Sequence, residues 1–424
     1  MNPKLIIAFV IGLFCQTAVA QTDSTQMNVD FLVLPALSYN SDLGLHYGIY
    51  GNLFFYGTPS SYPDYRHSIY LEASRYTSGQ TLLLAQYDSK QLIKKHRLTG
   101  SVALQIDPMY YFYGFNGEAQ LYDGYWDKDH GRAYYNTYRR YLHAGVVLQG
   151  VEFNHFRVVF GADYWNYRLE SFDHRDYDSD STLLNRYTAQ DLIHSNEASG
   201  GNRIELLAGF SYDNRDKQYA PTKGRQCECY LDFSPDLFGE GYRYLKLCAH
   251  YRQFIPIGEK RRTVVAFHLA YQGSLAGEPP YFVQQHINTL FLTQTFSEGL
   301  GGMTTVRGLP QNRLIGDGYA WGNFEMRIRL MDFKLLKRKI SVITNPFFDC
   351  GMITQGYRLD AMASLSENSL EELEKLTHTP QCSLGVGFKA VVNENSVFSV
   401  EIAKVFVNPT RYPVGINVGL NYIF

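Results

Sequence analysis

The sequence lacks any long apolar run after its first 20 residues, and this absence excludes a helical membrane span. Such a span needs roughly 18 or more consecutive apolar residues, and no later segment provides them. Tryptophan is scarce, with 3 residues against 34 tyrosines and 27 phenylalanines. The formal net charge is only −2, so no basic field is available to neutralise phosphates, and nucleic acid is excluded as the expected partner.

Known catalytic motifs are missing as well. No G-x-S-x-G, H-E-x-x-H or paired C-x-x-C occurs, and a hydrolase would need Ser, His and Asp brought within hydrogen-bond reach by the fold. The best metal candidates alternate in the acidic segment 172 to 180, namely Asp173, His174, Asp176, Asp178 and Asp180. A calcium loop also needs a glycine and a distal glutamate, where Ser181 and Tyr187 stand. We therefore favour a solvated acidic loop, with no metal, no cofactor and no enzymatic activity.

The N-terminus has the pattern of a signal peptide. Lys4 provides the positive charge, the apolar core runs from Leu5 to Phe14, and Ala18-Val19-Ala20 provides the small-residue cleavage site. Phe14 is too bulky for lipoprotein cleavage before Cys15, so secretion is favoured over lipidation. The sequence predicts a signal peptide at 1–20, a short periplasmic segment at 21–28 and a barrel at 29–424.

Cysteine is also sparse, and its distribution is a poor disulfide framework. The exported chain would carry an odd number of cysteines, at positions 227, 229, 248, 350 and 382. Cys229 and Cys248 fall roughly opposite each other across a predicted hairpin, but alternation places them on opposite faces. We expect small apolar strand residues rather than a disulfide.

What recurs along the chain is a period of two. The final segment places Val414, Ile416, Val418, Leu420, Tyr422 and Phe424 on one face and glycine or asparagine on the other. A soluble sandwich would also alternate in this way. Export, long strands with aromatic ends and an aromatic C-terminus favour a membrane barrel.

The sequence predicts an all-β fold, a sixteen-stranded antiparallel transmembrane β-barrel. The expected strands are 29 to 39, 43 to 56, 66 to 77, 80 to 89, 95 to 107, 133 to 150, 154 to 171, 201 to 213, 224 to 235, 242 to 256, 260 to 274, 318 to 331, 339 to 350, 382 to 392, 395 to 405 and 413 to 424. The segment 366 to 378 is expected to form a short capped helix inside an outer loop.

The connections indicate an orientation. The long ones, 108 to 132, 172 to 200, 275 to 317 and 351 to 381, all fall at one end, which is expected to face outward. Basic segments such as IKKHR (93 to 97) fall at the opposite, periplasmic end. These turns either contact anionic phospholipid headgroups of the inner leaflet or are ordinary solvated turns.

Several motifs resemble those of the BamA/TamA superfamily, also called the bacterial surface antigen family. Val306-Arg307-Gly308-Leu309 is similar to its V-R-G-[FY] motif in the long outer loop before the twelfth strand, with leucine in place of the aromatic residue. The other matching pieces, in family order, are YFYGFNG (111 to 117), DNRDKQYAPTKG (213 to 224) and PFFDCG (346 to 351). Asn417, Gly419, Tyr422 and Phe424 match the family's C-terminal assembly signal.

The arginine of this motif has two interpretations. An ordinary surface cation is one. A guanidinium inside a barrel lumen would instead require carboxylate partners, and alternation places Glu325 and Asp349 toward the lumen. The resemblance implies the second interpretation, with a loop that folds inward, Arg307 contacting Glu325 and Asp349, and Gly308 forming the tight tip.

The resemblance implies an outer-membrane barrel of a Gram-negative bacterium for protein insertion or transport. Its relatives carry periplasmic POTRA domains, for which residues 21–28 leave no room, so we expect a form without them and a periplasmic or lipoprotein partner. Other expected partners are outer-membrane lipids and the barrel assembly machinery that inserts the chain. The alternative is a passive pore or structural subunit without insertase activity. Gly415 and Gly419 are compatible with a weak seam and equally with ordinary closure.

Overall fold

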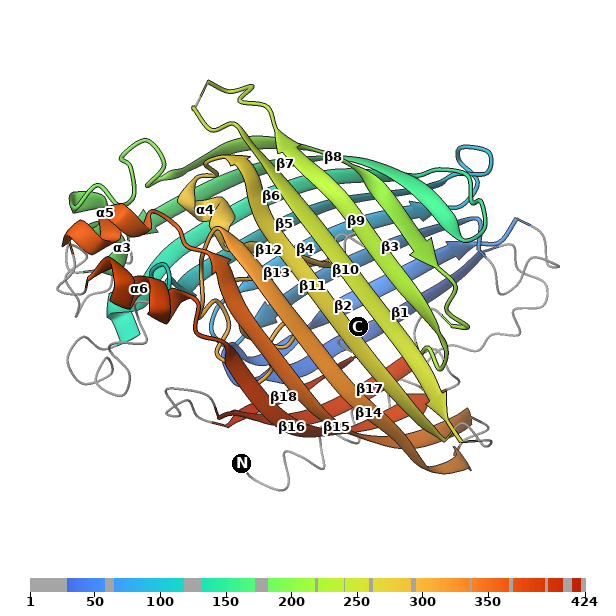
Figure 1. The fold of residues 1–424 in the computed structure, drawn as a ribbon. Helices are drawn as coiled ribbons and strands as arrows, with labels where there is room; N and C mark the ends of the chain where they lie inside the picture. The colour runs from blue at the N-terminus through green and yellow to red at the C-terminus, as the bar shows by residue number, and fades with distance from the viewer. Residues whose placement is uncertain are drawn as a thin grey trace.

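A computed structural model describes residues 29–420 except 58–64, 118–131, 172–181, 218–219, 240, 259–261, 291–294, 336–337, 366–368, 393–395 and 407–413. The described chain forms one closed antiparallel barrel (Figure 1). Its strands are β1 (Val29–Asn40), β2 (Gly44–Phe55), β3 (His67–Tyr76), β4 (Thr81–Ser89), β5 (Arg97–Tyr111), β6 (Asn136–Gln149), β7 (Phe156–Ser171), β8 (Gly200–Asp213), β9 (Gly224–Ser234), β10 (Tyr244–Ile257), β11 (Thr263–Gly277), β14 (Gly318–Leu335), β15 (Arg338–Gln355), β16 (Gln381–Val392), β17 (Ser396–Val405) and β18 (Gly415–Leu420). The predicted sixteen-stranded fold is confirmed.

The two faces of the wall have opposite polarity. On β10, Lys246, His250 and Arg252 are buried toward the lumen, whereas apolar side chains such as Phe160 on β7 and Phe210 on β8 are exposed on the outside. A soluble sandwich would place its apolar face inward. An apolar outer face around a polar lumen is the arrangement of a barrel surrounded by lipid.

The connections contain more regular structure than the sequence predicts. The expected helix is present as α6 (Leu370–Thr377), which begins with a capping box between Ser369 and Glu372. Elements that were not predicted are η4 (Arg132–Tyr135), α3 (Leu183–Ala189), α4 (Tyr281–Gln284), α5 (Leu359–Leu365) and the hairpin β12 (His286–Leu290) with β13 (Thr295–Glu298). They escape prediction because each spans only one or two turns, or a few strand residues, where periodicity is weak. No helix among the described residues is long and apolar enough to cross a membrane.

Four long connections pack together into a cap, a term we use for the loops joining β5 to β6, β7 to β8, β11 to β14 and β15 to β16. Figure 1 shows their helices gathered at one end of the barrel. Their buried side chains form one apolar cluster, which includes Phe112, Phe115, Tyr135, Leu184, Tyr187, Ile193, Tyr281, Phe282, Ile315, Tyr357, Met362 and Leu373. Asn116 joins three of these loops, because its Nδ2 donates to Tyr357 O at 2.7 Å and its backbone N donates to Ile315 O at 2.7 Å. The cap is therefore one packed unit.

The predicted segments 1–20 and 21–28 lie outside the described residues, and so do Tyr422, Phe424 and the acidic segment Asp173 to Asp180. The roles given to them remain predictions.

Candidate functional site

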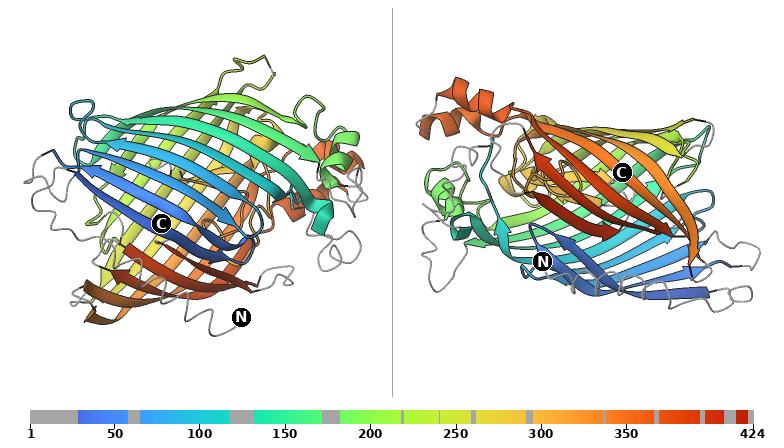
Figure 2. Two further views of the ribbon diagram at one scale, coloured as in Figure 1. Left: turned by 180° about the vertical axis from the view of Figure 1, so that it is seen from behind. Right: turned by 90° about the horizontal axis from the view of Figure 1, so that it is seen from below.

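The loop between β11 and β14 (278–317) enters the lumen of the barrel and carries the V-R-G motif. Figures 1 and 2 both show this loop, with β12 and β13, within the outline of the strands. Val306 and Leu309 pack with Trp321, Ile353 and other residues of the neighbouring strands in one buried cluster. Arg307, between them, has 0% of its surface exposed. An arginine buried to this degree needs several partners to replace its lost hydration.

Asp349 on β15 is the main partner of Arg307. The guanidinium donates from Nε to Asp349 Oδ2 at 2.7 Å and from Nη2 to Oδ1 at 2.8 Å. The backbone N of Arg307 also donates to Asp349 Oδ2 at 3.1 Å. Two parallel N–H···O bonds form the bidentate geometry that only arginine provides. The carboxylate therefore fixes both the side chain and the backbone of the loop.

Two further carboxylates complete the arginine site. Arg307 Nη1 donates to Glu325 Oε1 on β14 at 2.7 Å and to Glu401 Oε1 on β17 at 3.1 Å. Lys389 Nζ lies 2.6 Å from Glu401 Oε1, and Arg327 Nε lies 2.9 Å from Glu325 Oε2. Three cations therefore face three carboxylates, counting Asp349, and the buried cluster is balanced in charge.

The predicted contacts of Arg307 with Glu325 and Asp349 are present, and Glu401 is the partner that the sequence interpretation missed. The alternation along β17 could have revealed Glu401, because Val400 and Ile402 on either side of it are exposed outward. That alternation places Glu401 in the lumen, where a carboxylate needs a cation. The guanidinium also lies 3.4 Å from the ring centroid of Phe347, a cation–π contact beneath the ion pairs.

Gly308 forms the tip of the loop, with φ 87°, a conformation that favours glycine. The tip lies against the last two strands. A Cβ on Gly308 would lie 3.0 Å from the backbone carbon of Ala403, and a Cβ on Gly415 would lie 2.8 Å from the Cα of Gly308. The close approach of the loop therefore explains why residue 415 is a glycine. The two interpretations from the sequence, a weak seam and ordinary closure, did not include this reason.

The barrel closes at a seam between β1 and β18. Only two residue pairs join these strands among the described residues, Tyr39 with Val418 and Asn40 with Asn417. β1 pairs with β2 along its whole length, and β18 is described as far as Leu420. Figure 2 shows blue β1 and the red strands where the two ends of the sheet meet.

The inward loop bridges this seam. On one side Arg307 and Gly308 contact β17 and β18, as described above. On the other side the backbone N of Gln311 donates to Asp42 Oδ2, in the turn between β1 and β2, at 3.0 Å. We call Arg307, Gly308, Glu325, Asp349 and Glu401 the loop latch. The latch and the seam together form the candidate site.

The order of the strands and the inward loop before β14 agree with a known family. The model of the Omp85 superfamily domain matches residues 68–416. The chain belongs to the Omp85 superfamily. The resemblance to BamA/TamA proteins predicted from the motifs is thereby confirmed, and family membership supports outer-membrane protein assembly or translocation at a general level.

Solved structures share the fold of this Omp85 barrel. BamA from Haemophilus ducreyi lacking POTRA domains 1-3 matches with a TM-score of 0.58 at 15% sequence identity, over 93% of this chain and 70% of that one. CdiB from Escherichia coli matches with a TM-score of 0.56 at 10% identity, over 95% of this chain and 64% of that one. The chain therefore spans less than two thirds of CdiB. No curated protein matches the sequence.

The other motifs occupy distinct places in the Omp85 barrel. Asn116 of the segment 111 to 117 joins the cap loops. In the turn between β8 and β9, Asp216 accepts hydrogen bonds from the backbone N of Thr222 at 2.8 Å and of Lys223 at 3.1 Å. Partial burial is the largest single influence and raises the pKa of Asp216, but the hydrogen bonds to its charged form together outweigh burial, so the pKa lies below its ordinary value. These two motifs therefore stabilise connections, whereas the V-R-G motif and the segment PFFDCG (346 to 351), which contains Asp349, meet in the latch.

The C-terminal signal is described only in part. Asn417 is buried and opposes Asn40 across the seam, and a Cβ on Gly419 would contact only Met303 Cε at 3.5 Å. The assembly role of these residues remains a prediction. Among the residues that the structure describes, no group of three His, Cys, Asp or Glu side chains is arranged to hold a metal ion.

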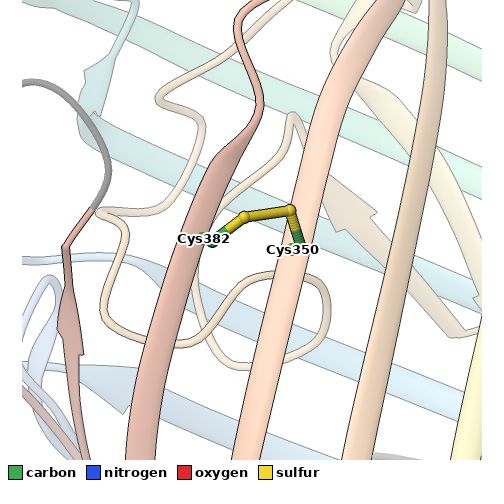
Figure 3. The surroundings of a disulfide bond; sticks show 2 residues. All are labelled: Cys350 and Cys382. Carbon is green, nitrogen blue, oxygen red and sulfur yellow. A yellow bond between two sulfur atoms is a disulfide. The ribbon is translucent and has the colours of Figure 1, made fainter.

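The expectation that no disulfide forms is wrong. Cys350 and Cys382 are directly opposed on β15 and β16 and form a disulfide, with a Cα–Cα distance of 4.1 Å (Figure 3). The prediction for the other pair holds, since Cys229 opposes Ala249 and both Cys229 and Cys248 are free. The disulfide was missed because a long loop separates the two strands, so their register could not be read from the sequence.

Proposed function

We propose that this Omp85 barrel takes part in the insertion or transport of proteins at the outer membrane of a Gram-negative bacterium, with the cap outside and the short turns in the periplasm. The observation that carries the proposal is the inward loop that bridges the seam between β1 and β18. A latch of balanced buried charge holds the loop on β14, β15 and β17. The same loop reaches Asp42 across the seam. The loop therefore links residues inside the lumen to both sides of the seam, where we propose that the wall opens.

The proposed action is non-covalent and requires no cofactor. A strand edge with unpaired N–H and C=O groups is a template for another strand. We propose that β1 and β18 separate at the seam, which would make both of their edges available to a client strand. We further propose that outer-membrane lipids border this seam, that the C-terminal signal serves the chain's own insertion, and that a periplasmic or lipoprotein partner delivers clients.

Depletion of the protein from its native membranes tests the role directly. If it assembles or transports proteins, other outer-membrane barrels or exported proteins should fall in amount, as measured by quantitative proteomics of outer membranes. Unchanged levels would oppose the proposal and favour a structural subunit. A large steady conductance of the purified protein in planar bilayers would favour a passive pore.

A crosslink across the seam tests whether the seam must open for function, because the crosslinked barrel is still present in the membrane. In a chain whose free cysteines are replaced, the pair Tyr39→Cys and Val418→Cys, two positions that oppose each other across the seam, should form a disulfide that closes it. The matched control is Ile49→Cys with Ala73→Cys, an opposed pair on β2 and β3. Oxidation of the seam pair should reproduce depletion, whereas the control pair should not. Normal client levels with a fully crosslinked seam would argue against lateral opening.

A further inference from the structure

The outer wall of the barrel contains an open, shallow hollow that faces the membrane. It has a volume of about 520 Å³ and lies across β3 to β7. Its floor is lined by Ala85, Gly100, Ala144 and Ala162, and larger side chains such as Tyr87 and Val146 form its sides. The volume falls within the range of about 300 to 1000 Å³ that is typical of small-molecule sites.

The hollow exists because small outward side chains lie next to large ones. Leu71, Leu142, Phe160 and Leu206 are exposed on the same outer face. Gly100 lies between Tyr87 and Val146 in the sheet register. A Cβ on Gly100 would find its nearest atom at 3.7 Å, so the position has room for a side chain that it does not carry. The surface is therefore shaped to accept an apolar group from the bilayer.

The hollow lies next to a turn that is both apolar and basic. Residues 90–96 join β4 to β5, the two strands that supply Ala85 and Gly100. Gly100 is three residues from the start of β5, roughly 10 Å at the rise of a strand. In the turn Leu92 and Ile93 are exposed, and they are followed by exposed Lys94 and Lys95. Exposed apolar side chains beside lysines are typical of a segment at the boundary between acyl chains and headgroups.

The charges around this turn leave Lys94 and Lys95 available. Arg97 donates to Asp88 at 2.8 Å, and Lys90 lies over the ring of Tyr65 at 4.5 Å. On the next periplasmic turn Glu152 is paired with Arg157. Lys94 and Lys95 make no ion pair with any residue that the structure describes. A phosphate at the membrane surface would complement both of them.

We propose that the hollow binds an acyl chain of an anionic phospholipid of the inner leaflet, whose phosphate contacts Lys94 and Lys95. The hollow supplies apolar contact area and the turn supplies headgroup recognition. Lipids of the outer leaflet are excluded because the hollow opens near the periplasmic ends of β4 and β5. The inference rests on the outer-membrane orientation proposed above and is independent of insertion or transport activity.

Native mass spectrometry of the detergent-purified protein tests this site, with phosphatidylglycerol and phosphatidylcholine of equal chain length as probes. The native protein should bind phosphatidylglycerol in preference. Gly100→Leu should fill the hollow and reduce binding of both lipids. The double variant Lys94→Gln, Lys95→Gln should weaken only phosphatidylglycerol, roughly fivefold for each lysine removed.

Matched changes elsewhere on the wall provide the controls. Ala390→Leu fills an outward position on β16, and Lys334→Gln removes a charge at the periplasmic end of β14; neither should alter lipid binding. If Gly100→Leu does not fold, judged by heat-dependent gel mobility, Ala144→Leu serves in its place. The proposal is overturned if the filled variants bind phosphatidylglycerol like the native protein, or if the lysine variant keeps the headgroup preference. It is also overturned if filling the hollow instead dissociates a dimer, because a second copy would then be the occupant.

Discussion

Arg307 and Glu401 lie 94 residues apart in the chain, yet Arg307 Nη1 donates to Glu401 Oε1 at 3.1 Å inside the barrel. This contact ties the inward loop to β17, the strand next to the closing strand. With Asp349 and Glu325 it extends the latch from the middle of the sheet to the vicinity of the seam. A change at Arg307 should therefore affect both the stability of the barrel and its closure.

Arg307→Ala should lower the free energy of unfolding by about 3 to 5 kcal/mol, because it leaves buried carboxylates without their common partner. Arg307→Lys should have a smaller effect, since it keeps the charge but loses the bidentate contact with Asp349. Urea unfolding in detergent, followed by tryptophan fluorescence, measures both. Arg329→Ala, half-buried on β14, is the control and should cost less than about 1 kcal/mol. Equal effects of Arg307→Ala and Arg329→Ala would contradict a stabilising latch.

The three carboxylates should not be equivalent. Double-mutant cycles of Arg307→Ala with Asp349→Asn and with Glu401→Gln should give coupling energies of about 0.5 to 3 kcal/mol. The cycle with Asp349 should give the larger value, because Asp349 accepts two short bonds whereas Glu401 is shared with Lys389. A larger coupling with Glu401 would show that its proximity to the seam outweighs bidentate geometry.

The sequence predicted what alternation and motif order determine. Alternation alone assigned Glu325 and Asp349 to the lumen, and the V-R-G resemblance then placed Arg307 against them. Glu401 was missed because no motif pointed to β17, although its neighbours Val400 and Ile402 show which way it faces. Lys389 is buried in the same lumen and needs a carboxylate partner, and that requirement would have pointed to Glu401.

Features that depend on register or on the packing of loops could not be read from the sequence. The disulfide depends on which residues of β15 and β16 stand opposite each other, and the long loop between the strands hides this. The explanation for Gly415 depends on a loop tip that comes from more than 100 residues earlier in the chain. Local patterns set the strands of this barrel, whereas contacts distant in sequence set its closure.

Gly415 and Gly419 form a matched pair on β18. Gly415→Ala should displace the loop tip and cost about 1 to 3 kcal/mol, because its Cβ would lie 2.8 Å from the Cα of Gly308. Gly419→Ala should be nearly neutral, because its Cβ would lie 3.5 Å from Met303 Cε. Hydrogen–deuterium exchange should show faster exchange at 301–310 in the first variant alone. Similar exchange in both would mean that the tip does not depend on this close approach.

Asp42 should make closure of the seam sensitive to pH. Burial raises the pKa of its carboxyl, although the hydrogen bond from the Gln311 backbone N lowers it in part. Since the folded pKa exceeds the unfolded value of about 3.9, the folded chain holds more protons between the two values. The resulting stability is fully present below the unfolded pKa and is lost as pH rises through the folded pKa.

Asp42→Asn keeps an oxygen acceptor for Gln311 and removes this titration. The difference in unfolding midpoint between native protein and Asp42→Asn should therefore change with pH in the acidic range, with the native protein relatively more stable at the lower pH. The other carboxylates are present in both proteins, so their contributions to the pH dependence of stability cancel in the difference. A difference that stays flat with pH would remove Asp42 as the cause.

The disulfide between Cys350 and Cys382 should stabilise the barrel through the loop that it closes. The two residues are 32 apart in sequence, and the chain-entropy model gives about 4 kcal/mol for a loop of this length. Cys350→Ser should lower the unfolding free energy by up to this amount and abolish any response to dithiothreitol. Cys248→Ser alters a buried free cysteine and should leave the response to the reductant intact. If the native protein unfolds identically with and without reductant, β15 and β16 are held together by their backbone ladder alone, and the crosslink contributes nothing to the strands that carry Asp349 and Lys389.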